Sequence, residues 1–219
     1  MKTLLAAFVL LFSAAPALAA EPAYCSLSEL MKHRIPYDRS GIKNQQVFRF
    51  GALHLAGLAV GESKTSQVIA MSDEFSDTDR AQKYCTWYLN DGNDQAARAF
   101  NWFNVERPNG DIQGSVRHYR DVLKGVFADN AINMLDCAVR HHYLALGCDG
   151  MKHRGPTVFG MLLAYSGCTP KKAAEIVNTI WGLNTVPAAS RLAVIEEGYR
   201  MGTANPAARQ QLQDAFSQQ

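Results

Sequence analysis

The segment from Asp129 to Lys172, DNAINMLDCAVRHHYLALGCDGMKHRGPTVFGMLLAYSGCTPKK, is the part of the chain from which we predict the fold. It contains three of the five cysteines and three of the six histidines, and a basic loop joins its two apolar stretches. Asp129 or Asn130 can accept a first-turn N–H, and nothing from 131 to 146 breaks a helix before Gly147, which suits a left-handed helix end. The sequence therefore predicts one helix over residues 131–146.

Two further helices are expected within the same segment. After the polar loop 148–154, Gly155-Pro156 is typical of the cap and first position of a helix, and Thr169-Pro170 repeats this pattern. On the first predicted helix, a rotation of about 100° per residue places His142 in the apolar stripe, whereas His141 points elsewhere. The segment thus predicts three consecutive helices.

The N-terminal residues have the features of a secretory signal peptide. Lys2 gives a positive start, residues 4–12 are an apolar run too short to span a bilayer, and Ala17-Leu18-Ala19 is a small-residue cleavage pattern. Cys25 lacks the small residues that precede a lipidated cysteine. We expect residues 1–19 to be a signal peptide and residues 20–219 to be a single domain in the bacterial periplasm or the medium.

Charge argues against nucleic acid binding, and hydropathy argues against a transmembrane segment in the mature chain. The formal charge of +2 falls to about +1 once Lys2 is removed, which argues against nucleic acid binding. The mature chain contains no apolar run of eighteen or more residues, so no transmembrane segment is expected. No cofactor motif is recognised, and none is expected.

The five cysteines predict two disulfides and one free thiol in an oxidising compartment. If Cys137 and Cys148 belong to one helix, they lie about 16 Å apart and cannot pair, because a disulfide needs Cα atoms within about 7 Å. Cys148 with Cys168 is the preferred pair, and Cys137 with Cys168 is its competitor. Cys25 would then pair with Cys85.

The rest of the chain shows no convincing strand alternation, so the expected fold class is an all-α bundle of about eight helices. The other expected helices cover residues 26–31, 45–60, 79–89, 94–105, 112–127, 187–199 and a last one that starts at Asn205-Pro206. The predicted core consists of Phe50, Leu53, Leu58, Trp87, Phe100, Leu135, Val139, Phe159, Leu162, Ile176 and Ile180. The acidic stretch 73–79 lacks the glycine and the closing glutamate of a calcium loop.

A metal site drawn from His141, His142, Asp149 and His153 is one candidate, because imidazole and carboxylate groups at a helix end and in its loop can converge on zinc. Adjacent histidines on a helix point about 100° apart, however, and do not easily bind one ion together. The alternative is a core role for His142 and a surface role for His141. Cys137 as a nucleophile would need a base and an oxyanion hole that the sequence does not show.

Glu62 is a candidate catalytic acid. The pair Glu62-Ser63 follows the apolar segment 45–60 and resembles the catalytic glutamate-serine pair of lytic transglycosylases, although Lys64-Thr65-Ser66 departs from that family's pattern. The resemblance implies peptidoglycan cleavage with Glu62 as the catalytic residue.

The favoured candidate is a site for an anion. Lys152, His153 and Arg154 directly precede one expected helix, and Lys171 and Lys172 lie in the first turn of the next. Cations at a helix N-terminus are mildly unfavourable, whereas anions are favoured there, so an acidic group bound between the two helices would explain the arrangement.

The leading functional hypothesis is a non-catalytic exported protein that binds an acidic protein or an anionic envelope ligand, such as an inhibitor, an immunity-type protein or a secretion accessory factor. The basic residues above would bind it, with His141 on the exposed flank of the first helix. The alternative is an envelope hydrolase that uses either a metal at the histidines or Glu62.

Overall fold

The chain folds around a mixed β-sheet, so the expectation of an all-α bundle is wrong. The computed structural model describes residues 20–36, 46–59, 85–90, 101–124, 126–127, 132–148, 150–183 and 188–217. Among these residues, six strands form one sheet in the order β1-β2-β3-β8-β4-β5, and β6 and β7 form a separate two-stranded ribbon. The strands are β1 Arg34–Ile35, β2 Gln46–Phe50, β3 Leu53–Ala59, β4 Thr86–Asn90, β5 Asn101–Asn104, β6 Val126–Phe127, β7 Ile132–Asn133 and β8 Tyr143–Cys148.

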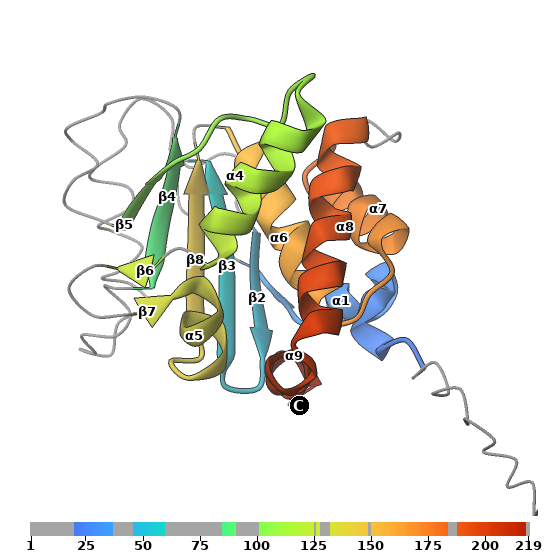
Figure 1. The fold of residues 1–219 in the computed structure, drawn as a ribbon. Coiled ribbons are helices and arrows are strands. Elements are labelled where there is room, and N and C mark those ends of the chain that lie inside the picture. The colour runs from blue at the N-terminus through green and yellow to red at the C-terminus, as the bar shows by residue number, and fades with distance from the viewer. Residues whose placement is uncertain are drawn as a thin grey trace, which may run out of the picture.

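Helices make up most of the second half of the chain, as Figure 1 shows. Six of the expected helices are confirmed with shifted ends, because apolar periodicity and start signals such as Ser26 before α1 and Pro170 in α7 are local. The helices are η1 Ala23–Cys25, α1 Leu27–Lys32, α4 Ile112–Lys124, α5 Met134–Val139, α6 Arg154–Tyr165, α7 Pro170–Ile180, α8 Ala189–Ala204 and α9 Pro206–Ser217.

The sheet has an antiparallel part and a parallel part. β1 pairs with β2 and β2 with β3 in antiparallel fashion, whereas β3, β8, β4 and β5 run parallel to one another. A tight turn at Gly51-Ala52 joins β2 to β3, and Gly51 has the positive φ of 55° that favours glycine. The segment 45–60, expected as one helix, is therefore a hairpin.

The central strand β8 replaces the second half of the helix expected over 131–146. α5 is short and begins at Asn133, whose side chain accepts the backbone N–H of Asp136 at 2.9 Å, so Asp129 and Asn130 are not its cap. His142, with φ 52°, then turns the chain into β8, whose six residues are all buried. A strand covered on both faces is a continuous apolar run, which its composition does not distinguish from a buried helix. The same reason explains β4, whose residues 86–89 are buried and where a helix over 79–89 was expected. The helix expected over 94–105 is also wrong, because residues 101–104 form the strand β5.

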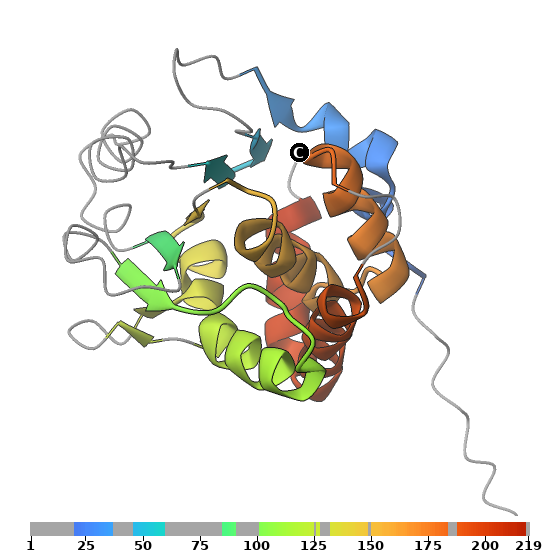
Figure 2. The same cartoon turned by 90° about the horizontal axis from the view of Figure 1, so that it is seen from above.

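The helices pack closely beside the sheet. α6 is buried along its whole length, and Figure 2 shows α4, α6 and α8 side by side next to the strands. A Cβ at Gly198 of α8 would lie 2.6 Å from the carbonyl oxygen of Met161 in α6, so glycine permits this close approach. Of the predicted core residues, Phe50, Leu53, Trp87, Phe159, Leu162 and Ile176 are buried, and Leu135, Val139 and Ile180 are partly buried. Phe100 and the side chain of Leu58 lie outside the described part.

The structure contains two disulfides and one free cysteine, as predicted, but the pairing differs. Cys25 is bonded to Cys168, Cys85 to Cys137, and the buried Cys148 is free. The predicted pairs Cys148–Cys168 and Cys25–Cys85 are wrong, because Cys148 ends a strand and lies at the opposite end of α6 from Cys168. Within the described residues, no helix is both long and apolar enough to cross a bilayer.

Candidate functional site

The candidate site lies where β8 ends and the chain leads into α6. Four parallel strands have their carboxyl ends at one edge, and ligands of open parallel sheets bind outside this edge. β8 lies between β3 and β4, and its last residue is Cys148. The loop after Cys148 leads directly into the N-terminus of α6, so a buried strand, a loop and a buried helix converge at one cysteine (Figure 1).

The loop curls around the sulfur of Cys148. The backbone N–H groups of Gly150, Met151 and Gly155 are directed at this sulfur. Met151 is buried, has a left-handed φ of 47°, and its Sδ lies 3.6 Å from the Cys148 Sγ. A Cβ on Gly155 would lie 3.5 Å from the same Sγ and would overlap Met151. Successive N–H groups around a left-handed residue form a concavity that binds anions.

Arg154, the first residue of α6, extends this positive environment. It is 6% exposed, and its Nε donates a hydrogen bond to the carbonyl oxygen of Val105 at 2.8 Å. This bond holds the segment after β5 against the loop. Burial raises the pKa of the Cys148 thiol, whereas the three N–H groups and the charge of Arg154 act in the opposite direction.

A second arginine reaches the loop from α8. Arg191 is 7% exposed, and it donates one hydrogen bond to the carbonyl oxygen of Lys152 at 2.8 Å and one to Oδ1 of Asn178 at 2.9 Å. Its buried Nε has no hydrogen-bond partner among the described residues. Burial lowers the pKa of Arg191, and both of its acceptors are neutral. An anion nearby would compensate this buried charge.

His153 shows how many positive charges meet at the loop. Its pKa is lowered, first by burial and then by the charges of Arg191, Arg107, Arg154 and Lys152. The side chains of Lys152 and Arg107 are exposed, whereas both other arginines are buried. The loop therefore combines buried and exposed cations around one set of backbone N–H groups.

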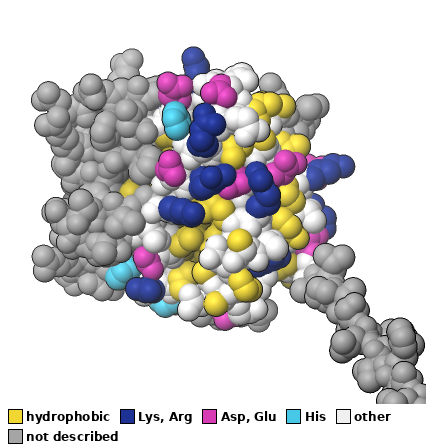
Figure 3. Space-filling model, viewed as in Figure 1, with side chains coloured by type: hydrophobic (Ala, Val, Ile, Leu, Met, Phe, Trp, Pro, Cys, Tyr) yellow, Lys and Arg dark blue, Asp and Glu magenta, His cyan; other side chains and the backbone are white. Residues whose placement is uncertain are grey.

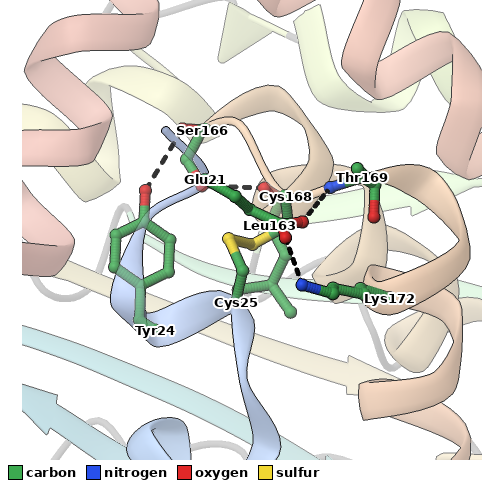
Figure 4. Close-up of a disulfide and its surroundings, with 8 residues drawn as sticks. All are labelled: Glu21, Tyr24, Cys25, Leu163, Ser166, Cys168, Thr169 and Lys172. Carbon is green, nitrogen blue, oxygen red and sulfur yellow. Dashed lines mark hydrogen bonds and ion pairs between the residues drawn. A yellow bond between two sulfur atoms is a disulfide. The ribbon is translucent and has the colours of Figure 1, made fainter. Parts of the chain in front are cut away.

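The structure separates the residues that the sequence grouped into one basic patch. Lys152, His153 and Arg154 lie at one end of α6, and Lys171 and Lys172 lie beyond its other end, about 18 Å away along its 12 residues. The idea of one patch across two helix N-termini is wrong. Lys172 instead pairs with Glu21, whose other carboxylate oxygen accepts the backbone N–H of Thr169 at 2.8 Å (Figure 4).

The histidine cluster is also divided. His141 and His142 precede β8 and His153 follows it, which places about 20 Å of strand between them. The alternative metal site therefore does not assemble, and no other group of three metal-binding side chains occurs in the described residues. His141 is also remote from the basic loop. Asp149 and Glu62 lie outside the described part.

A second group of basic side chains lies on α4 and α8 (Figure 3). Arg120 and Arg200 both pair with the buried Glu197, at 2.5 and 2.6 Å. Arg117 and Lys124 are exposed on α4. Since Glu197 compensates part of this charge, the face differs from the loop, where Arg191 has only neutral acceptors.

Sequence reasoning missed Cys148 as the centre of the site. The available signal was a cysteine that ends an apolar run and precedes a glycine, three basic residues and the helix start at Gly155-Pro156. Arg191 could not have been found in this way, because only the packing of α8 brings it to the loop.

Comparison with known proteins adds no functional information. No family model matches the chain, and neither a curated protein nor a solved structure matches it significantly. The function must therefore be argued from the site.

Proposed function

We propose that this chain is an exported hydrolase of phosphate monoesters, in which Cys148 is the nucleophile and the loop 150–155 binds the phosphoryl group. The observation that carries the proposal is the position of the Cys148 sulfur, which faces three backbone N–H groups at the start of α6 beside Arg154. A helix N-terminus and an arginine are the two partners that phosphate oxygens favour. The two disulfides are compatible with an oxidising compartment, which supports export.

The reaction follows from these positions. The thiolate of Cys148 attacks phosphorus, the S–P bond forms, the ester P–O bond breaks, and the leaving oxygen takes its electron pair and a proton. Water then attacks phosphorus, and cleavage of the S–P bond releases inorganic phosphate and the thiolate. The N–H groups and Arg154 stabilise the charge on the other phosphoryl oxygens in both steps.

Phosphate esters are favoured over acyl substrates because backbone N–H groups and Arg154, and no described imidazole, lie at the Cys148 sulfur. An acyl-transfer cysteine is usually activated by an imidazole, and among the described residues no imidazole hydrogen-bonds to the Cys148 sulfur. Glu106 and Asp111 are exposed carboxyl groups on the segment that Arg154 holds against the loop. They are the candidates for the acid that protonates the leaving oxygen.

Hydrolysis of p-nitrophenyl phosphate by the purified mature chain tests the proposal. Cys148→Ser should reduce the rate to background, because a hydroxyl in this position has no activating base. Gly155→Ala should also lose activity, since a Cβ there overlaps Met151 beside the sulfur. Gly110→Ala is the matched control, because Gly110 lies outside the loop and a Cβ there would meet nothing within 4 Å. Activity that persists in Cys148→Ser would exclude this mechanism.

Non-catalytic binding of an acidic ligand at Lys152, His153 and Arg154 is a second candidate, and one observation favours it. Cys148 is only 2% exposed, and burial raises its pKa, which favours the unreactive thiol. In that case the wild-type chain and Cys148→Ser would bind inorganic phosphate equally well by calorimetry, and neither would hydrolyse the ester.

A further inference from the structure

Arg191 lies in α8, outside the loop, but its hydrogen bond to the Lys152 carbonyl oxygen constrains the loop backbone. Its guanidinium joins α8, to which it belongs, to the Asn178 side chain of α7 and to the Lys152 carbonyl of the loop. The C=O and N–H of a trans peptide point in opposite directions. By holding the Lys152 carbonyl, Arg191 therefore turns the N–H of His153 away from itself and fixes the orientation of this peptide.

Arg191 is also unusual because its charged group is buried and its hydrogen-bond acceptors are neutral. A charge this deeply buried ordinarily has an ionic partner, because desolvation costs several kcal/mol. Here both acceptors are neutral, and the buried Nε has no hydrogen-bond partner among the described residues. A bound oxyanion at the loop would provide a negative charge that none of the hydrogen-bond partners of Arg191 among the described residues supplies.

We infer that Arg191 is a positioning residue of the anion site: it holds the Lys152 carbonyl so that the loop can receive an oxyanion, and the bound oxyanion offsets its buried charge. This inference rests on the proposed function. It makes affinity for the anion depend on a residue that need not touch it.

The test compares Arg191→Met and Arg191→Lys with Arg200→Met, an exposed arginine of the same helix. The measurements are the Kd of inorganic phosphate, the rise in Tm that phosphate causes, and KM and kcat for p-nitrophenyl phosphate. Arg191→Met should raise both the Kd and KM about tenfold or more, because it removes a buried charge that the anion compensates. Arg191→Lys should recover part of the affinity, and Arg200→Met should match the wild type.

A purely structural role would give a different pattern. It would lower Tm equally with and without phosphate, whereas the positioning role reduces the increment that phosphate adds. An unchanged phosphate increment in a folded Arg191→Met or Arg191→Lys variant would overturn the inference, and Arg191→Lys decides if Arg191→Met does not fold. Failure of the wild-type chain to bind phosphate would instead overturn the proposed function.

Discussion

His153 is the residue at which the positive charge of the loop can be measured most directly. Burial and four neighbouring cations lower its pKa below the ordinary value of 6.5. His54 in β3 also has a lowered pKa, through burial and the charge of Arg49. Between the lowered pKa and about 6.5 the unfolded chain binds more protons than the folded one, so the free energy of unfolding decreases as the pH falls through this range.

We expect His153→Gln to weaken this pH dependence. The substitution removes a group that must take up its proton on unfolding, so the unfolding free energy should fall less between about pH 6.5 and pH 5 than in the wild type. Urea unfolding at several pH values measures the change. His54→Gln should have a similar effect, because burial and Arg49 lower the pKa of His54 as well. His118→Gln, at an exposed position of α4, is the control. A His153→Gln slope equal to that of the wild type would contradict the assignment.

At the scale of elements, the position of the site depends on how closely α8 approaches α6. Gly198 and Gly202 of α8 face the backbone of Met161 and Tyr165 in α6. The same contact brings the first turn of α8, with Arg191, to the loop that precedes α6. Widening the contact between these helices would therefore affect both stability and the loop.

Gly198→Ala should destabilise the protein. Alanine is favoured over glycine in a helix by about 1 kcal/mol, but overpacking against a backbone costs about 1–3 kcal/mol, so the net effect should be a loss of stability. Thermal or urea unfolding measures it. Gly110→Ala, where a Cβ meets nothing within 4 Å, should change stability little. A Gly198→Ala variant that is more stable than the wild type would show that α6 and α8 can separate at no cost.

For the whole molecule, the two disulfides join parts that are distant in sequence. Cys25–Cys168 ties the N-terminal segment to the turn between α6 and α7, and Cys85–Cys137 ties β4 to α5. Their cysteines are 143 and 52 residues apart in the sequence. Cross-links over such separations restrict the unfolded chain, and each stabilises the folded state by about 2–5 kcal/mol. Tyr24 adds to the first tie, since its hydroxyl donates to the Ser166 carbonyl at 3.1 Å and burial raises its pKa to about 12 (Figure 4).

Alkylation of the unreduced protein should label Cys148 alone. The label should appear slowly in the native protein, because Cys148 is 2% exposed, and completely after unfolding. Peptide mapping by mass spectrometry should then recover the pairs Cys25–Cys168 and Cys85–Cys137. A labelled cysteine other than Cys148, or a linked pair that includes it, would contradict this arrangement.

The sequence by itself determined the features that depend on neighbouring residues. Thr169-Pro170 predicts where α7 starts, and Gly155-Pro156 predicts the start of α6 to within two residues, because the fixed φ of proline suits the first turn of a helix. The number of cysteines predicts two disulfides and one thiol. The run Lys152 to Arg154 already marks a positive loop before a helix, which is part of the candidate site.

Only the tertiary structure decided which apolar runs are strands and which distant residues meet. Tyr143–Cys148 is a strand because β3 and β4 supply its hydrogen bonds, and no local signal records those partners. The disulfide pairs, the separation of Lys172 from the loop and the approach of Arg191 to Lys152 all follow from helix packing between distant segments. Contacts of this kind are global, because each depends on where the rest of the chain has already packed.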